Sequence, residues 1–311
     1  MPEEPWTILK ILQWTTRYFE EKTVAEPRTS AEVLLAHVLG QDRLYLYLNY
    51  DRPLDRHELS AFRRCIKRRL TGEPVHYITG TREFWSLPLN VSPAVLIPRA
   101  ETEVLVEEVV EFVSQRASTQ TELKIMDLGT GSGAIAIALA REFPLARIVA
   151  IDLSMAALKL ARQNAREHEV EQRIHFLCGD MFAGMLGPGA KFTAVVANPP
   201  YVSHAAFPKL PREIRDFEPR RALDGGPQGL AVISGIVRQA PAFLSPSGAV
   251  FLEIGAGQAD TVSGMVHQSH CYRSYRIRKD YGGIDRVLVA EKAEDAETHK
   301  QEIARTRNAG G

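Results

Sequence analysis

The tetrapeptide Asn198-Pro199-Pro200-Tyr201 has the residue types that point most directly to chemistry. It follows the apolar run 192–197, which predicts a buried strand ending where open α/β sheets bind their ligands. Asn198 offers a donor and an acceptor, and Tyr201 adds a flat aromatic face. Two consecutive prolines stiffen the turn and leave its carbonyls free to accept. These groups suit a planar NH2-bearing group, such as a carboxamide or an amino-purine edge, and a plain rigid turn is the alternative.

A glycine-rich turn follows the strand predicted over 123–128, and Asp127 lies on that strand just before the turn. The turn consists of Gly129, Thr130, Gly131, Ser132 and Gly133. Glycines at alternate positions let a ligand approach the backbone at a helix N-terminus. The spacing is G-x-G-x-G rather than the dinucleotide G-x-G-x-x-G. The Asp127 carboxylate would repel a pyrophosphate and attract an ammonium, so the loop favours S-adenosylmethionine over NAD, and a simple tight turn stays the alternative.

Two further predicted strands end in acidic residues. Asp152 lies about 20 residues past the glycine loop, where such folds bind the hydroxyls of a ribose. Its alternative role is the N-cap of the helix that begins near Ser154, although Ser154 can also serve as that cap. Asp180 follows the third strand and is expected to accept from an adenine amino group, while Met181 and Phe182 cover the ring. Three strand ends therefore offer what an adenosyl ligand needs.

Composition excludes several classes of protein. The 311 residues carry 38 basic and 38 acidic side chains, so the net charge does not call for nucleic acid as a partner. No apolar stretch reaches the roughly 20 residues needed to cross a bilayer. The acidic start lacks the apolar core of a signal peptide, which indicates a soluble cytoplasmic protein without a membrane partner.

Cysteines and histidines give no sign of a metal site. Cys65, Cys178 and Cys271 are far apart, which favours buried, inert thiols in a reducing compartment. Three histidines, His76, His168 and His204, have no companions at metal-ligand spacing. We therefore expect no bound metal.

Hydrophobic periodicity predicts two domains of different class. Residues 1–75 have helical patterns, and residues 76–100 contain a short hairpin that links them to the larger part, 101–290. From about residue 122, strands alternate with helices, which predicts a doubly wound, mostly parallel α/β sheet. The segments 275–279 and 286–290 have no helix between them and predict an antiparallel final strand. The polar residues 291–311 are expected to be a disordered tail.

The predicted helix 59–70 is strongly basic on one side. That side carries Arg63, Arg64, Lys67, Arg68 and Arg69. Such a helix suits a phosphate backbone or an acidic partner, although a solvated helix face is the more common explanation.

Taken together, these motifs resemble the peptide chain release factor glutamine methyltransferase family of class I S-adenosylmethionine-dependent methyltransferases. Amino-purine methyltransferases share the Asn-Pro-Pro-Tyr signature, so other segments decide between the two groups. The segments that carry the resemblance are 73–80, 82–89, 95–103, 216–220 and 280–283, and the similarity extends from about 28 to 290. Ala100 stands where the family often has proline, and Met181 stands where some members have an aromatic residue over adenine.

The resemblance implies the class I methyltransferase fold, S-adenosylmethionine as cofactor and a defined substrate. That substrate is the side-chain amide nitrogen, N5, of the glutamine in the Gly-Gly-Gln motif of class 1 release factors, which a small N-terminal helical domain helps to hold. We expect the Asn198 oxygen and the Pro199 carbonyl to accept the two N–H groups of that amide. Tyr201, with Leu96 or Ile97 opposite, would form the walls of the amide-binding site next to Pro200. Asn198, Pro199 and Tyr201 are thus the expected catalytic residues.

Three other functions stay open at this point. An amino-adenine methyltransferase of DNA or RNA is disfavoured by the zero net charge and by the lack of a segment resembling a target-recognition domain. A methyltransferase for a ribosomal protein glutamine is close in sequence, but the hairpin 82–89 matches the release factor branch better. A catalytically idle cofactor-binding module is disfavoured because Asp127, the glycines, Asp152 and Asn198 are all intact.

Overall fold

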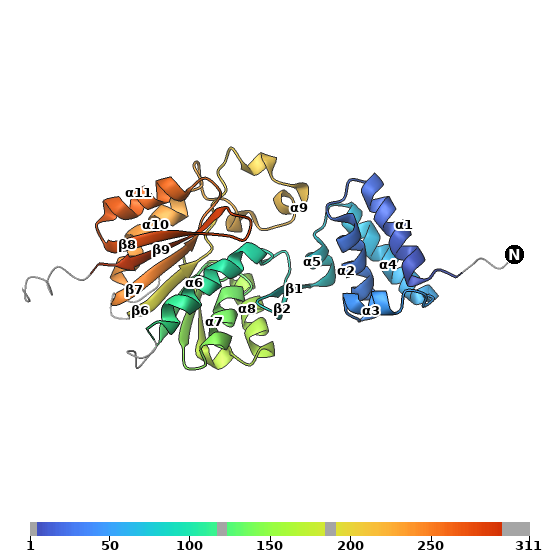
Figure 1. Ribbon diagram of the computed structural model, residues 1–311, viewed down its shortest axis with the longest axis horizontal. Coiled ribbons are helices and arrows are strands. Elements are labelled where there is room, and N and C mark those ends of the chain that lie inside the picture. The colour runs from blue at the N-terminus through green and yellow to red at the C-terminus, as the bar shows by residue number, and fades with distance from the viewer. Residues whose placement is uncertain (1–4, 117–122, 184–190, 294–311) are drawn as a thin grey trace, which may run out of the picture. The chain divides into compact units, whose positions relative to one another are not determined.

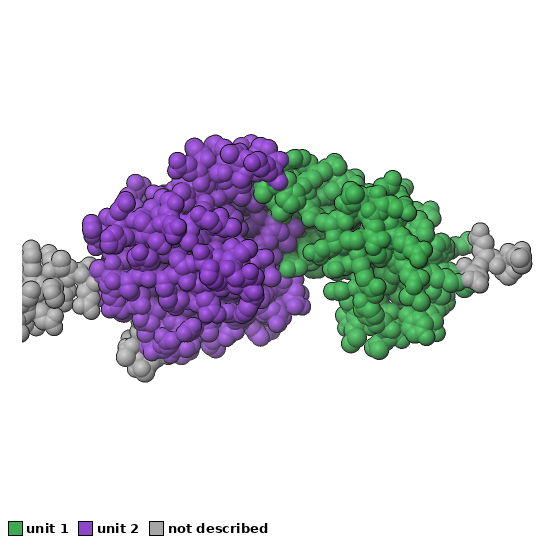
Figure 2. Space-filling model, turned by 45° about the horizontal axis from the view of Figure 1, so that its top comes forward, with its two compact units in different colours: residues 1–82, 91–93, 210–218 green, residues 83–90, 94–209, 219–311 purple. Residues whose placement is uncertain are grey.

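The computed structural model describes residues 5–116, 123–183 and 191–293, and these form two compact units (Figure 2). The first unit comprises residues 1–82, 91–93 and 210–218, and the second comprises 83–90, 94–209 and 219–311. The first unit is therefore discontinuous in sequence. Of the tail expected over 291–311, residues 294–311 lie outside the described residues, and the last strand extends to Lys292.

The first unit is helical. Its helices are α1 (Ile8–Glu21), α2 (Pro27–Leu39), α3 (Arg43–Leu48), α4 (Arg56–Leu70), α5 (Val75–Thr79) and α9 (Arg212–Arg215). Side chains that accept from backbone N–H groups start several of these helices: Thr7 caps α1, Asp42 caps α3, and Asp55 forms a capping box with Glu58 at α4. The buried core includes Phe19, Leu34, Leu35 and Phe62. Apolar stripes at helical spacing thus account for the predicted helices.

Arg69 is not part of an exposed basic face, so the prediction for it was wrong. It is 5% exposed, and its guanidinium donates to the Glu73 and Ala25 carbonyls. It also pairs with Glu213 over 2.7 Å. Arg69 therefore stabilises the first unit from inside by joining α4 to the segment 210–218. The other four cations of the predicted basic side, Arg63, Arg64, Lys67 and Arg68, are exposed.

The second unit is built on a sheet of seven strands among the described residues. The strands are β3 (Lys124–Leu128), β4 (Arg147–Asp152), β5 (Ile174–Cys178), β6 (Phe192–Ala197), β7 (Leu244–Glu253), β8 (Tyr272–Lys279) and β9 (Asp285–Lys292). Their order is β5-β4-β3-β6-β7-β9-β8. The first five of these are parallel, and β9 is antiparallel to both β7 and β8. The doubly wound sheet with an antiparallel final strand is thereby confirmed, and the final strand inserts between its two predecessors.

Helices cover both faces of this sheet (Figure 1). One face packs against α6 (Glu103–Ser114), α7 (Ala134–Glu142) and α8 (Met155–Glu167), and the other against α10 (Ala231–Gln239) and α11 (Ala259–Ser269). Short 3-10 turns complete the unit: η1 (Ala100–Thr102), η2 (Glu171–Arg173), η3 (Phe207–Lys209), η4 (Arg220–Ala222) and η5 (Ala240–Ala242). All six residues of β6 are buried, as a strand covered on both faces must be.

The predicted hairpin forms from β1 (Thr81–Phe84) and β2 (Leu87–Asn90). Its turn residues Trp85 and Ser86 have φ values of 54° and 56°, in the left-handed region that a two-residue hairpin turn requires. Glu103 accepts from the Trp85 backbone N–H, and Glu142 accepts from the Trp85 ring N–H. Two glutamates of the second unit therefore hold a turn that its own residue types disfavour.

The expectation of buried cysteines was wrong for two of the three. Cys178 and Cys271 are exposed, Cys65 is partly buried, and all three thiols are free. Cys178 ends β5, which lies at an edge of the sheet and so lacks a covering neighbour. Among the described helices, none is both long and apolar enough to cross a membrane.

Candidate functional site

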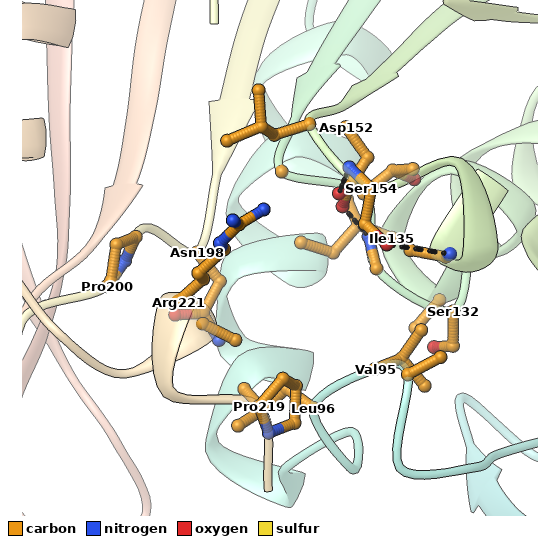
Figure 3. Close-up of a pocket in the computed structure, with 18 of the residues that line it drawn as sticks. Val95, Leu96, Ser132, Ile135, Asp152, Ser154, Asn198, Pro200, Pro219 and Arg221 are labelled. Carbon is orange, nitrogen blue, oxygen red and sulfur yellow. Dashed lines mark hydrogen bonds between the residues drawn. The ribbon is translucent and has the colours of Figure 1, made fainter. Parts of the chain in front are cut away.

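A cavity of about 850 Å³ opens in the second unit beyond the carboxyl ends of β3, β4, β5 and β6 (Figure 3). The loops that follow these four strands all contribute to its lining, as does the segment 94–102 before α6. This is the edge where a doubly wound sheet binds its ligands. Figure 3 shows Asn198 and Pro200 on one side of the cavity and Asp152 and Ser154 on another.

Most of the predicted site residues line this cavity. They are Leu96, Gly129, Thr130, Gly131, Ser132, Asp152, Asp180, Met181, Asn198 and Pro200. Five predicted residues are not among those that line it: Asp127, Gly133, Phe182, Pro199 and Tyr201. The lining also includes residues that the sequence did not assign to a binding site, namely Thr102, Ser154, Arg220 and Arg221.

The glycine loop turns tightly over Asp127. Gly129 and Gly131 have φ values of 72° and 57°, which residues with a Cβ rarely adopt. Asp127 is fully buried, and its Oδ2 accepts from the Thr130 hydroxyl over 2.6 Å. Its Oδ1 is buried without a hydrogen-bond partner among the described residues. Burial raises the pKa of Asp127 to about 7, so a cation bound above the loop would favour its ionised form.

Asp127→Asn is expected to remove part of the pH dependence of folding stability. Because the folded pKa of about 7 lies above the unfolded value, the folded state keeps a proton between about pH 4 and 7 that the unfolded state has released. The free energy of unfolding therefore falls as pH rises through this window, by at most about 4 kcal/mol for this group. Urea denaturation should show that the free energy of unfolding of the variant, relative to that of the parent, is larger at pH 8 than at pH 5. An equal difference at both pH values would contradict the prediction.

Asp152 joins two loops of the cavity. Its Oδ2 accepts from the Gly131 N–H over 2.9 Å and its Oδ1 from the Ser154 N–H over 2.8 Å. The cap of α8 is Ser154, whose side chain accepts from the Ala157 N–H. Asp152 is therefore not needed as a cap, and a carboxylate with about four acceptor sites keeps about two for a diol in the cavity.

The loop after β5 has an exposed part and a buried part. Asp180 is exposed and Met181 has a φ of 48°, an unusual conformation for a residue with a side chain. Phe182 is buried and stacks on Phe243 with ring centroids 4.7 Å apart. Phe182 thus anchors the loop in the core, whereas Met181 lines the cavity together with Gly179 and Asp180.

A chain of hydrogen bonds holds the Asn198 side chain. Asn198 Nδ2 donates to Thr102 Oγ1 over 3.0 Å, and Thr102 Oγ1 donates to Glu253 Oε2 over 2.6 Å. The Tyr201 hydroxyl donates to Glu253 Oε1 over 3.3 Å. Burial raises the pKa of Glu253 to about 7, while the Thr102 hydroxyl and the nearby Arg286 act to lower it. Because Nδ2 is engaged by Thr102, the Asn198 oxygen is the carboxamide atom left to accept.

The elbow 198–202 is clamped from its other side. Gln258 Nε2 donates to the carbonyls of both Tyr201 and Gly229 over 3.1 Å. The Val202 N–H donates to Leu223, and the Val202 carbonyl accepts from Gly225. A Cβ at Gly225 would lie 2.7 Å from the Pro200 oxygen, and one at Gly229 would overlap the Tyr201 oxygen. Glycine is required at both positions because the elbow packs directly on this backbone.

Comparison with known proteins decides the family. Residues 10–80 match the family described as PrmC N-terminal domain, and residues 102–214 match the family described as Methyltransferase small domain. A release factor glutamine methyltransferase of Geobacter sulfurreducens is 42% identical over 293 residues, which cover 93% of this chain and 98% of the relative. That of Rhodopirellula baltica is 36% identical, covering 94% of this chain and 98% of the relative. The chain belongs to the release factor glutamine methyltransferase family. It is therefore an enzyme that uses S-adenosylmethionine as methyl donor.

The fold of this methyltransferase also recurs in more distant proteins. The crystal structure of the hMettl16 catalytic domain in complex with an MAT2A 3'UTR hairpin superposes with a TM-score of 0.54. The superposition covers 74% of this chain and 82% of that one at 15% identity. At that identity the match shows the fold alone.

The residues of this methyltransferase fit its cofactor. Asp127 Oδ1 is buried beneath the loop and has no hydrogen-bond partner in the part of the chain that the structure describes, so it would attract a cationic group of a ligand bound there. A Cβ added at Gly129 would meet no atom within 4 Å, so the loop leaves open space where a ligand can approach its backbone. Asp152 retains acceptor sites suited to a ribose. Cations are also present, because Arg99 and Arg221 line the cavity.

Sequence reasoning missed the two residues that orient Asn198. Thr102 lies in the segment 95–103, which carries part of the family resemblance, but the sequence gives it no separate role; it is the N-cap of α6 without a side-chain cap hydrogen bond. Glu253 is the single acidic residue of the otherwise apolar run 249–254. That charge is the available signal in the sequence, since a buried carboxylate needs partners.

Proposed function

We propose that this enzyme transfers a methyl group to the side-chain amide nitrogen, N5, of the glutamine in the Gly-Gly-Gln motif of class 1 peptide chain release factors. One observation carries the proposal most directly. Asn198 lines the cavity with its NH2 group bound to Thr102, so its oxygen is left to accept from a substrate N–H. The choice of substrate is supported by the names of two relatives, each aligned over 98% of its own length.

We assign the binding of the cofactor to the loops at the ends of β3, β4 and β5. Bound S-adenosylmethionine would supply a methyl group on an electrophilic sulfonium sulfur. Asp152 would accept from the ribose hydroxyls, and the glycine loop would let the ligand lie against its backbone. Asp127 would contribute its charge from beneath the loop, and Asp180 with Met181 would bind the adenine. Gly133 and Phe182 would hold these loops from the core, since Gly133 packs against Ala161 and Phe182 against Phe243.

For the substrate, the elbow would align the amide nitrogen. The Asn198 oxygen and the Pro199 carbonyl would accept its two N–H groups, and among the described residues neither acceptor has another donor. Pro199 is not itself among the residues that line the cavity, but its two neighbours in the elbow, Asn198 and Pro200, are. Leu96 and Pro200 would enclose the amide from the cavity wall. Tyr201 would act through Glu253, to which its hydroxyl is bonded, rather than by touching the substrate.

Alignment is the main task, because the lone pair of an amide nitrogen is delocalised and nucleophilically weak. Holding both reactants in line is worth about 7–11 kcal/mol relative to a bimolecular encounter. Two acceptors on the N–H groups also stabilise the positive charge that develops on nitrogen in the transition state. The N-methylated product cation is a strong acid, so it can lose a proton to water without a dedicated base.

Methyl transfer from labelled S-adenosylmethionine tests this function. A purified class 1 release factor should take up label, and a variant with alanine in place of the Gly-Gly-Gln glutamine should take up none. Label in both proteins alike, or in added RNA or DNA but not in the release factor, would overturn the proposal.

We further propose that the enzyme works in the cytoplasm without binding nucleic acid or membrane. The three free thiols suit a reducing compartment, and the neutral net charge does not favour polyanions. We also assign the first unit the task of holding the release factor, with the exposed cations of α4 available to it.

A further inference from the structure

The hydrogen bonds around Asn198 determine which way its carboxamide faces. Thr102 lies between Asn198 and Glu253, at 3.0 Å from Asn198 Nδ2 and 2.6 Å from Glu253 Oε2. Thr102 is 4% exposed and Glu253 is 1% exposed, so solvent does not replace either contact. Thr102 and Glu253 are 151 residues apart in sequence and meet only because η1 packs beside the end of β7.

Proton counting makes this arrangement directional. A hydroxyl group has one hydrogen, and at pH 8, above the pKa of about 7 of Glu253, the ionised Glu253 carboxylate can only accept. The Thr102 hydrogen therefore points to Glu253, and its oxygen has only lone pairs to offer Asn198. A reversed carboxamide would oppose two acceptors and leave buried groups unpaired, which is a costly defect. Tyr201, bound to the other oxygen of Glu253, keeps that carboxylate fixed.

We propose that Thr102 and Glu253 are positioning residues which hold the Asn198 oxygen toward the substrate and thereby make the site select a carboxamide over a carboxylate. This inference rests on the proposed function. With the Asn198 oxygen and the Pro199 carbonyl both facing the substrate, glutamine can donate to each of them. Glutamate has no hydrogens to donate and would meet two acceptors. If Asn198 reversed, its NH2 group would face the substrate and accommodate a glutamate carboxylate.

A pair of substitutions at Thr102 distinguishes the contribution of the hydroxyl from that of the rest of the side chain. Thr102→Val keeps the shape and removes the hydroxyl, whereas Thr102→Ser keeps the hydroxyl. With a purified release factor at pH 8, T102V should lose about 10- to 30-fold in kcat. T102S should recover most of that loss, and the Kd of S-adenosylmethionine should change little in either variant. Thr15→Val is the matched control, because Thr15 is also fully buried but its hydroxyl has no partner among the described residues.

Substrate discrimination gives a readout that a loss of folded protein does not change. A release factor carrying glutamate in place of the Gly-Gly-Gln glutamine serves as competitive inhibitor, and its Ki is divided by the KM of the unaltered factor. This ratio is independent of the fraction of enzyme that is folded. In T102V it should fall about 5- to 10-fold relative to the parent and T15V.

The outcomes separate this inference from the proposed function. A parent enzyme that does not methylate the release factor refutes the function itself. If the parent is active, an unchanged ratio in T102V, or equal losses in T102S and T102V, refutes the positioning role alone. A lowered ratio in T102V together with recovery in T102S supports it.

Discussion

Replacing Asn198 by alanine is expected to lower kcat about 10³-fold, because in the proposed site this side chain supplies one of the two acceptors that align the substrate amide. The Kd of S-adenosylmethionine should stay within about threefold of the parent value, since the ribose and glycine-loop contacts come from other strands. Single-turnover methyl transfer measures the first quantity, and calorimetric titration measures the second.

The two measurements together exclude a simple loss of structure. In the Asn198→Ala protein, the Thr102 hydroxyl would no longer accept from residue 198. It would still donate to Glu253, so the fold around the elbow should persist. Turnover within tenfold of the parent would contradict the proposed role of Asn198. Cofactor binding that falls in parallel with turnover would place Asn198 in the cofactor site instead.

Gly229→Ala is expected to lower kcat at least about 100-fold by displacing the elbow. A Cβ at this position would overlap the Tyr201 carbonyl oxygen and lie 3.0 Å from Gln258 Nε2, which binds that carbonyl. The backbone of the elbow must therefore move, and a shift of about 1 Å at a reacting centre can cost about 10²-fold in rate. Steady-state kinetics with the release factor measures the loss.

Gly257→Ala provides the matched control. Gly257 has a φ of 80°, close to the 74° of Gly229, but a Cβ there would meet no atom within 4 Å. The strain of a left-handed residue, about 1–2 kcal/mol, is thus shared by both variants, and the clash is present only at Gly229. Gly257→Ala should keep kcat within about threefold. Equal losses in the two proteins would show that backbone strain rather than displacement of the elbow is responsible.

Local sequence patterns predicted the parallel core well because its strands consist of continuous apolar runs. The run Phe192–Ala197 was expected as a strand and is a fully buried strand with the same bounds. Alternating strands and helices then specify the doubly wound topology, which in turn places the strand-end loops at one edge. The cavity at that edge therefore follows from sequence reasoning that needs no long-range contacts.

Features that depend on distant partners could not be predicted in the same way. Arg69 belongs to the basic side of its helix by periodicity, but its partner Glu213 is 144 residues away, and this contact buries it. The Thr102–Glu253 pair spans 151 residues and carries no local pattern. Periodicity does not give the bounds of the short helix α3, because Leu44 and Leu48 are exposed and its sequence therefore lacks a core-facing stripe.

The same Arg69–Glu213 contact limits how this architecture can be recombined. Since residues 210–218 complete the first unit, the N-terminal helices up to residue 82 are not an independent domain. Exchanging residues 1–82 between relatives would leave a buried guanidinium beside a foreign or missing carboxylate. A chimera that inherits both segments from one parent keeps this pair together, so the two stretches form a single unit of inheritance despite the distance that separates them along the gene.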